Sequence, residues 1–156
     1  MIDKLSLSEI EALLYKQCVG RIGCYDDRVY VVPTSYAYDG KYIYCHTYEG
    51  KKMEIMRRNP DVCFQVDEMK DMANWNSVIA WGKFEEVKDQ VQRSEALNIL
   101  LKRELPITSS ITTHLGNTWP FSNGMNDIPG IVFRIFLTEK TGKFEKTSVS
   151  PQFSIQ

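Results

Sequence analysis

The sequence of 156 residues lacks the features that mark several common functional classes. It has no basic surplus, since 19 Lys and Arg stand against 20 Asp and Glu and the net charge is −1 with neutral histidines. Domains that bind nucleic acid usually carry such a surplus, so we expect no nucleic-acid partner. No segment reaches the apolar length that crosses a bilayer, and the N-terminus lacks the pattern of a secretory signal. We expect a cytoplasmic protein with no membrane partner.

Residues that bind metals or carry out nucleophilic catalysis are also scarce. The two histidines, His46 and His114, have no cluster of carboxylates or cysteines beside them, so we expect no metal site. The four cysteines form no C-x-x-C pair, and each lies in or beside an apolar run. This pattern predicts reduced, mostly buried thiols. No sequence marks a nucleophile elbow or a catalytic triad, and the catalytic residues stay unknown.

The N-terminal segment, residues 1–19, has the pattern of a helix. Two pairs have the spacing of a capping box: Ser6 with Glu9, and Ser8 with Glu11. The apolar residues that follow recur at helical spacing and would form one buried face. The length of the chain fits a single domain over residues 1–156.

Residues 21–46 change to the period of β-strands. Turn signals, Asp-Asp at 26–27 and Asp-Gly at 39–40, divide this region into three strands joined by two hairpins. Pro33 lies inside the second strand. Because proline cannot donate to a ladder, this strand should be an edge strand, or be bulged or interrupted there. Such a break leaves backbone groups free to contact a ligand.

The remainder of the chain alternates strands with helices. We expect a short helix over 50–58, strands over 61–68 and 76–87, a longer helix over 88–105, and a strand pair or one bent strand over 131–146. Gly82 predicts a bulge in the longest of these strands. Trp81 beside it occupies an alternating position inside the strand, and we expect it to be structural. Strands dominate, which indicates an antiparallel barrel or sandwich with peripheral helices.

Three segments read as irregular. We expect loops over 69–75 and 107–130, and a loose tail over 147–156. The second loop is rich in Ser, Thr, Asn and Gly and carries Trp119, which is our candidate for covering a flat ligand. Long loops in compact domains are often functional.

Two lysines, Lys51 and Lys52, stand where the short helix begins. Cations at a helix N-terminus are unfavourable by about 0.3–1 kcal/mol each, whereas an anion there is favourable. A bound phosphate would offset this cost, with Gly50 allowing close backbone approach and Thr47 adding a hydroxyl donor. The alternative is a pair of solvated surface lysines.

The order VPTSYAYDGKYIYCHTYEGKKMEIMRRNPDVCFQVD, followed by WNSVIAWGKFEEV, carries a resemblance to a known family. It resembles the pyridoxamine-5'-phosphate-oxidase-like, FMN-binding split-barrel superfamily, in particular its branch of flavin-nucleotide-binding proteins related to nitroimidazole-resistance proteins. The resemblance runs from about Gly20 to Val87. It implies a mainly β fold with peripheral helices, a six-stranded antiparallel split β-barrel of Greek-key type. It also implies a homodimer with FMN at the interface.

The resemblance and the lysine pattern together indicate a cofactor site. Its residues are Pro33, Thr34, Ser35, His46, Thr47, Gly50, Lys51, Lys52, Ser77 and Trp119. The lysine pair falls where the family binds the flavin phosphate, and the preceding His-Thr pair falls where it lines the phosphate and the ribityl chain. Pro33, Thr34 and Ser35 fall where the family runs along the isoalloxazine ring. Ser77 matches a position that is usually near the flavin.

The sequence departs from pyridoxamine-phosphate oxidases proper at two places. Their phosphate segment reads more like Ser-Arg-Lys, whereas this chain has Gly-Lys-Lys, and its C-terminal SVSPQFSIQ carries no basic residue for a substrate phosphate. The resemblance therefore implies an FMN-dependent reductase or oxidase acting on another small molecule, such as a nitroaromatic or a quinone. The alternative is a non-enzymatic protein of the same fold that binds or stores flavin or haem, with either histidine as an axial ligand.

Overall fold

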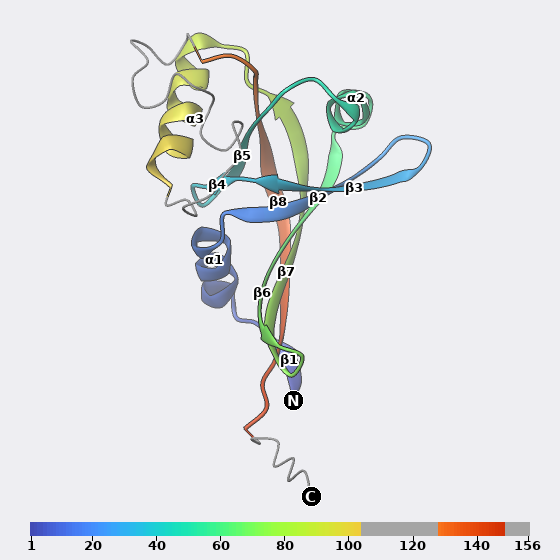
Figure 1. Ribbon diagram of the computed structural model, residues 1–156, viewed down its shortest axis with the longest axis vertical. Helices are drawn as coiled ribbons and strands as arrows, with labels where there is room; N and C mark the ends of the chain where they lie inside the picture. Colours follow the sequence, from blue (N-terminus) through green and yellow to red (C-terminus); the bar gives the residue numbers. More distant parts are fainter. Residues whose placement is uncertain (104–127, 149–156) are drawn as a thin grey trace, which may run out of the picture.

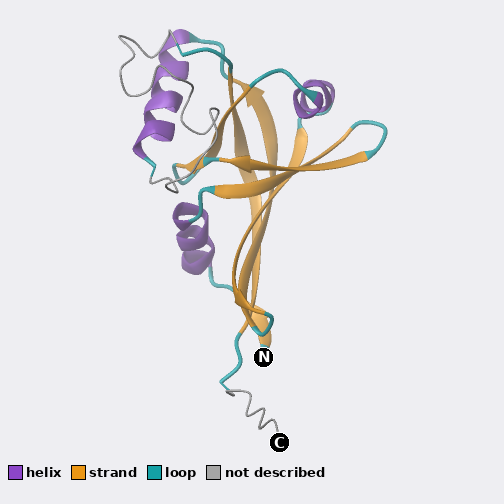
Figure 2. Cartoon of the chain, in the orientation of Figure 1, coloured by secondary structure: helices purple, strands orange, loops and turns teal. Residues whose placement is uncertain are grey.

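The computed structural model of the chain describes residues 1–103 and 128–148 and is organised around one antiparallel sheet (Figures 1 and 2). The strands in these residues are β1 (Ile2–Lys4), β2 (Val19–Tyr25), β3 (Val29–Ser35), β4 (Ala37–Tyr38), β5 (Tyr42–Thr47), β6 (Asp61–Asp71), β7 (Asn74–Glu86) and β8 (Ile131–Glu145). The helices are α1 (Leu7–Lys16), α2 (Lys51–Arg58) and α3 (Gln90–Lys102).

The sheet runs in the order β3-β2-β6-β7-β8-β5-β4, and β1 pairs with the end of β8. Six of its strands have six or more residues, and the two others are short. The two ends of the sheet, β3 and β4, follow one another in the chain with only Tyr36 between them. The sheet therefore curls without closing, and the predicted six-stranded split barrel is confirmed.

The first helix begins at the expected cap but is shorter than residues 1–19. The Ser6 hydroxyl accepts from the Glu9 N–H at 3.3 Å, and the Glu9 carboxylate accepts from the Ser6 N–H at 2.7 Å, which completes a capping box. The chain before this cap forms β1 instead of helix, because it pairs with residues 143–145 of β8. Long-range pairing here overrides local helix propensity.

The loop expected over 69–75 is wrong, because most of this segment is strand. β6 continues to Asp71 and β7 begins at Asn74, so only two residues turn. The Asp71 carboxylate accepts from the Ala73 N–H at 2.8 Å and from the Asn74 side-chain amide at 2.9 Å. This side-chain cap makes a tight hairpin possible where the composition suggested a loop.

The bulge predicted at Gly82 is present, as a register shift between Trp81 and Gly82 against β8. A Cβ atom at position 82 would collide with the carbonyl oxygen of Phe136, so the bulge requires glycine. β8 itself is one strand of 15 residues. The edge position predicted for the strand that holds Pro33 is also confirmed, although the chain is interrupted at Tyr36 rather than at the proline.

Two apolar clusters stabilise the fold. The larger fills the inner side of the curled sheet and includes Met53, Ile55 and Met56, the predicted apolar side of α2. The smaller joins α3 to β5 and β8. All four cysteines are free; two are buried and two are half-buried. Among the described residues, no helix combines the length and apolar character needed to cross a membrane.

Candidate functional site

The split of the barrel lies between β3 and β5, and side chains from both strands meet there. Alternation along β3 directs Thr34 to the inner side of the sheet, with Tyr30 and Val32, which pack against the larger cluster. Cys45 on β5 faces the same interior, is fully buried, and lies beside the Thr34 hydroxyl. Burial raises the pKa of the Cys45 thiol to about 12, so it stays neutral.

Helix α2 begins beside this seam with an open N-terminus. Gly50 is the N-cap, no side chain caps the helix, and the first intrahelical bond runs from the Glu54 N–H to the Gly50 carbonyl at 3.2 Å. The N–H groups of the first turn therefore lack intrahelical partners. A Cβ atom at position 50 would meet nothing within 4 Å, so open space lies in front of this end of the helix.

The charges on α2 divide into paired and unpaired groups. Arg57 donates to both carboxylate oxygens of Glu49 at 2.7 and 2.8 Å and also contacts Glu86, and Arg58 contacts Asp26 at 2.9 Å. No such ion pair joins either lysine of the first turn to a carboxylate within residues 1–103 and 128–148. The positive charge at the start of α2 is thus available to an external anion.

The two lysines differ in orientation. Lys51 is exposed, whereas Lys52 is half-buried and lies close enough to the buried thiols of Cys24 and Cys45 to oppose the rise in their pKa that burial causes. Of the two lysines, Lys52 is therefore the one whose charge acts on the interior of the barrel. Sequence reasoning treated the lysines as equivalent, but the structure distinguishes them.

Two hydroxyl groups near the seam make only local, long hydrogen bonds. The Thr34 hydroxyl donates to the Ser35 carbonyl at 3.2 Å, and the Thr47 hydroxyl donates to the Tyr48 carbonyl at 3.3 Å. Thr47 is buried and lies two residues beyond Cys45 on β5, on the same face of that strand. Both hydroxyls can rotate toward a ligand at the seam with little loss.

His46 lies on the opposite face of β5 from Thr47. It is 4% exposed, and its Nε2 donates to the Pro129 carbonyl at 2.6 Å, since a carbonyl can only accept. Gly130, at φ 98°, fits beneath the ring, because a Cβ there would lie 2.6 Å from Nε2. The structure therefore places His46 against the 128–130 segment, and not beside Lys52.

Ser77 and Pro33 lie on the outer face of the sheet. Ser77 on β7 accepts from the Gln65 side-chain amide at 3.3 Å, and Gln65 also donates to Asp67. Pro33 pairs with Arg21 across the outermost ladder, and its neighbours on the same face include exposed valines. Within one chain, Ser77 therefore lies among polar residues of β6 and β7, whereas the lysines lie at the start of α2. Trp119 lies outside the described residues.

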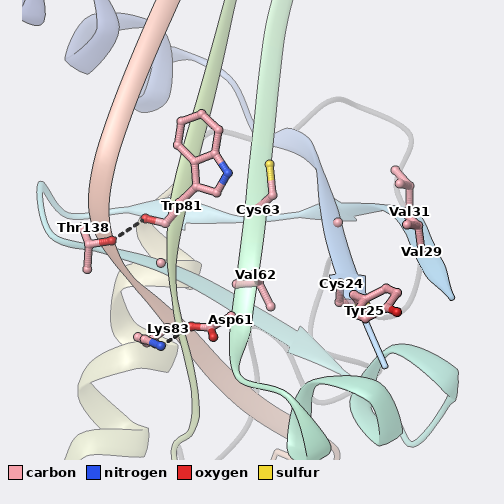
Figure 3. Close-up of a pocket in the computed structure, with 12 residues that line it drawn as sticks. Cys24, Tyr25, Val29, Val31, Asp61, Val62, Cys63, Trp81, Lys83 and Thr138 are labelled. Carbon is pink, nitrogen blue, oxygen red and sulfur yellow. Dashed lines mark hydrogen bonds and ion pairs between the residues drawn. The ribbon is translucent and has the colours of Figure 1, made fainter. Parts of the chain in front are cut away.

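Sequence reasoning missed an apolar groove on this outer face. Figure 3 shows residues from β2, β3, β6 and β7 around a cavity of about 540 Å³. Trp81 is 40% exposed and lines the groove with Tyr25, Val29 and Val31, and its expected structural role stays a prediction. The alternation in VYVVP, with Val29 at 72% and Val31 at 63% exposure, was the available signal. Such a patch on a sheet face indicates an interaction site.

An open antiparallel barrel with a helix starting beside its split defines the split-barrel class of proteins. The family model described as pyridoxamine 5'-phosphate oxidase matches residues 6–120, and the chain belongs to this family. The resemblance found in the sequence is therefore confirmed.

Known proteins support this assignment. The crystal structure of a FAD-binding protein from Mesorhizobium loti is 32% identical with a TM-score of 0.71, and the match covers 94% of this chain and 99% of that one. A candidate 5-nitroimidazole antibiotic resistance protein from Bacteroides thetaiotaomicron shares the fold, with a TM-score of 0.69 at 20% identity over 92% of this chain and 87% of that one. An uncharacterized protein from Rhizobium meliloti is 33% identical over 84 residues, which span 53% of this chain and 56% of that protein.

Proposed function

We propose that the chain binds a flavin nucleotide, FMN, at the seam between β3 and β5, and that it uses the flavin as an oxidoreductase. The observation that carries the proposal is the unpaired positive charge at the open start of α2, next to the barrel mouth. Membership of the family and the likeness to a FAD-binding protein of 32% identity support a flavin as the anionic ligand.

The phosphate group would be held at the first turn of α2. Lys52 supplies a half-buried charge, Lys51 an exposed one, and the free N–H groups of the turn supply directional donors. The open space in front of Gly50 leaves room for the group, and Thr47, the last residue of β5 before α2, supplies a hydroxyl that can rotate. These donors match one terminal phosphate, and for this reason we propose FMN.

The ring would lie along the free edge of β3. Within the described residues, β3 pairs only with β2, so its other edge has backbone groups that can contact a flat heterocycle near Pro33, Thr34 and Ser35. His46, held by the Pro129 carbonyl, would orient the ligand from the α3 side of β5 rather than exchange a substrate proton. Bound flavin supplies the electron transfer, while the chain supplies anchoring and hydrogen bonds.

We also propose that the protein is a homodimer. The groove around Trp81 and Val31 leaves an apolar face of the sheet exposed, which a second copy would cover by two-fold symmetry. The same packing would bring Ser77 of one copy near the site of the other, which a single chain does not do. Sedimentation should give a dimer at micromolar concentration; a monomer that still binds flavin tightly would contradict this proposal.

The test of the ligand is a comparison of three flavins. Isothermal titration of flavin-free protein should give the strongest binding for FMN, with riboflavin weaker by at least about tenfold, since a charge-assisted contact contributes roughly 1.5–3 kcal/mol. Equal affinity for FMN and riboflavin would contradict the proposed phosphate site. Tighter binding of FAD than of FMN would keep the flavin site and reject the choice of FMN.

The proposed activity has its own measurement. A nicotinamide cofactor should bleach the bound flavin anaerobically, and a nitroaromatic or quinone acceptor should restore its absorbance. Flavin that binds tightly but is neither reduced nor reoxidised would identify a binding or storage protein instead of an enzyme.

A further inference from the structure

One residue, Tyr36, joins the two ends of the curled sheet. β3 ends at Ser35 and β4 begins at Ala37, so the chain changes direction at this tyrosine. The segment proposed to lie along the flavin ring, Pro33 to Ser35, comes directly before it. The position of Tyr36 therefore affects the free edge of β3. The inference below rests on the proposed function, because it concerns the same seam.

Tyr36 is bound to the end of α1 by two hydrogen bonds. Its main-chain N–H donates to the Cys18 carbonyl at 3.0 Å, and its hydroxyl donates to the Leu14 carbonyl at 2.7 Å. Leu14 lies in the last turn of α1, where carbonyl groups lack intrahelical partners. Tyr36 thus supplies a donor to the helix end and ties the junction of β3 and β4 to the same helix.

The Tyr36 ring is also fixed by packing. It is buried and meets the Phe64 ring of β6 edge-on, with centroids 4.8 Å apart and planes at 76°. Phe64 in turn packs against Gly20 of β2, where a Cβ atom would lie 2.5 Å from the ring. Burial raises the pKa of the Tyr36 hydroxyl, which therefore stays protonated and able to donate. A residue held in this way transmits the position of α1 to the junction.

Tyr38 offers a matched comparison, because it anchors the same helix from a different place. Its hydroxyl donates to the Glu11 carboxylate at 2.7 Å and accepts from the Lys140 ammonium at 3.0 Å. Tyr38 lies on β4, which pairs with β5, and it does not adjoin the ring segment. Figure 1 shows α1 beside β4 and away from α2. Of these two tyrosines, only Tyr36 connects α1 directly to the proposed ring edge.

We propose that Tyr36 is a positioning residue for the ring of the bound flavin. Its two hydrogen bonds to α1 set the direction in which the chain leaves β3. They thereby place the backbone of Thr34 and Ser35 along the seam. Helix α1 has no residue in the proposed site and acts on it through this tyrosine.

The first test needs no flavin. Tyr36→Phe keeps the ring but removes the donor to the Leu14 carbonyl, so hydrogen exchange over residues 33–36 should become about tenfold faster. Tyr38→Phe also removes one hydroxyl and should leave exchange there within about twofold. Both variants should lower the melting temperature by about 2–4 °C, so a difference in global stability would not explain the contrast. Unchanged exchange in Tyr36→Phe would overturn the proposal.

The second test uses bound flavin. The visible circular dichroism of protein saturated with FMN reports the surroundings of the ring, and it should change in Tyr36→Phe but not in Tyr38→Phe. FMN and riboflavin affinities should fall together in Tyr36→Phe, by about fivefold, because the proposed phosphate site at α2 stays intact. Tyr38→Phe should keep both affinities within about twofold. A loss confined to FMN, or equal effects of the two variants, would overturn the positioning role.

The outcomes separate this inference from the proposed function. Native protein that binds neither flavin would contradict the proposed function. Native protein that binds FMN, with Tyr36→Phe behaving as Tyr38→Phe does, would contradict only the role of Tyr36. If Tyr36→Phe does not fold, native flavin-free protein decides, since the Tyr36 amide should exchange at least about tenfold more slowly than the mean of the β3 amides. Exchange as fast as that mean would overturn the proposal.

Discussion

The two ends of α2 carry the same amount of positive charge in opposite surroundings. At the C-terminal end, Arg57 and Arg58 are bound by three carboxylates from other parts of the chain. At the N-terminal end, Lys51 and Lys52 form no ion pair with a described carboxylate, and they oppose the helix dipole. Cations with internal partners attach the helix to the fold. Cations that oppose the helix dipole and have no described ion-pair partner are better explained by a bound anionic ligand.

Removal of both lysines tests this difference most severely. In Lys51→Ala with Lys52→Ala we expect FMN affinity to fall on the order of a hundredfold or more, because two charge-assisted contacts are lost. Riboflavin affinity should change little, since it has no phosphate. Fluorescence titration with both flavins measures the two effects on one protein. A parallel loss of both flavins would mean that the lysines support the fold rather than the phosphate.

Separate replacements sharpen the comparison within the pair. Lys52→Ala should weaken FMN about tenfold or more, because Lys52 is half-buried and its charge acts on the buried thiols inside the barrel. Lys51→Ala should cost less than about fivefold, since exposed ionic contacts contribute roughly 0–1 kcal/mol. The reverse order of effects would show that the ligand approaches from the solvent side of α2.

His46 offers a test on the other face of β5. His46→Asn retains a donor toward the Pro129 carbonyl but cannot titrate near neutral pH. We expect a modest fall in flavin affinity, with reductase turnover at saturating flavin within about tenfold of the native rate. General acid–base catalysis typically contributes roughly a hundredfold or more, so a loss of that size with full flavin occupancy would assign His46 a role in the chemistry.

Arg57→Gln should have the smallest effect on the ligand. It breaks the ion pairs with Glu49 and Glu86, so the melting temperature should fall measurably. FMN affinity should fall by less than about threefold, because Arg57 lies at the far end of α2 and only its exposed partner Glu49, which directly precedes Gly50, is released near the proposed phosphate site. A drop in FMN affinity similar to that of Lys52→Ala would remove the distinction between the two ends of the helix.

Much of this fold could be predicted from the sequence, because its signals are local. A few residues that are close in the sequence determine each of three features: the capping box at Ser6, the bulge at Gly82 and the apolar side of α2. The misses depend on distant partners. β1 exists because β8 lies beside it, and the tight turn after Asp71 depends on a side-chain cap that composition does not reveal.

The site could be predicted only as a set of residues, and not as an arrangement. Alternation along β5 places His46 and Thr47 on opposite faces, and Ser77 contacts Gln65 of β6 while Lys52 lies on α2. The distinction between the lysines depends on where the buried thiols lie, which is a property of the packed barrel. The groove at Trp81 was missed because an alternating strand looks the same whether its outer face meets water or another protein.

The order of strands also has a consequence for hydrogen exchange. β8 is paired along one edge by β7 and, over residues 131–136 and 143–145, along the other by β5 and β1, so the amides of these two segments should exchange only when the molecule unfolds globally. β3 ends the sheet and pairs within the described residues only with β2, so its amides should exchange through local opening. The proposed ligand seam thus runs along an edge strand, and protection gained there on adding FMN would report binding directly.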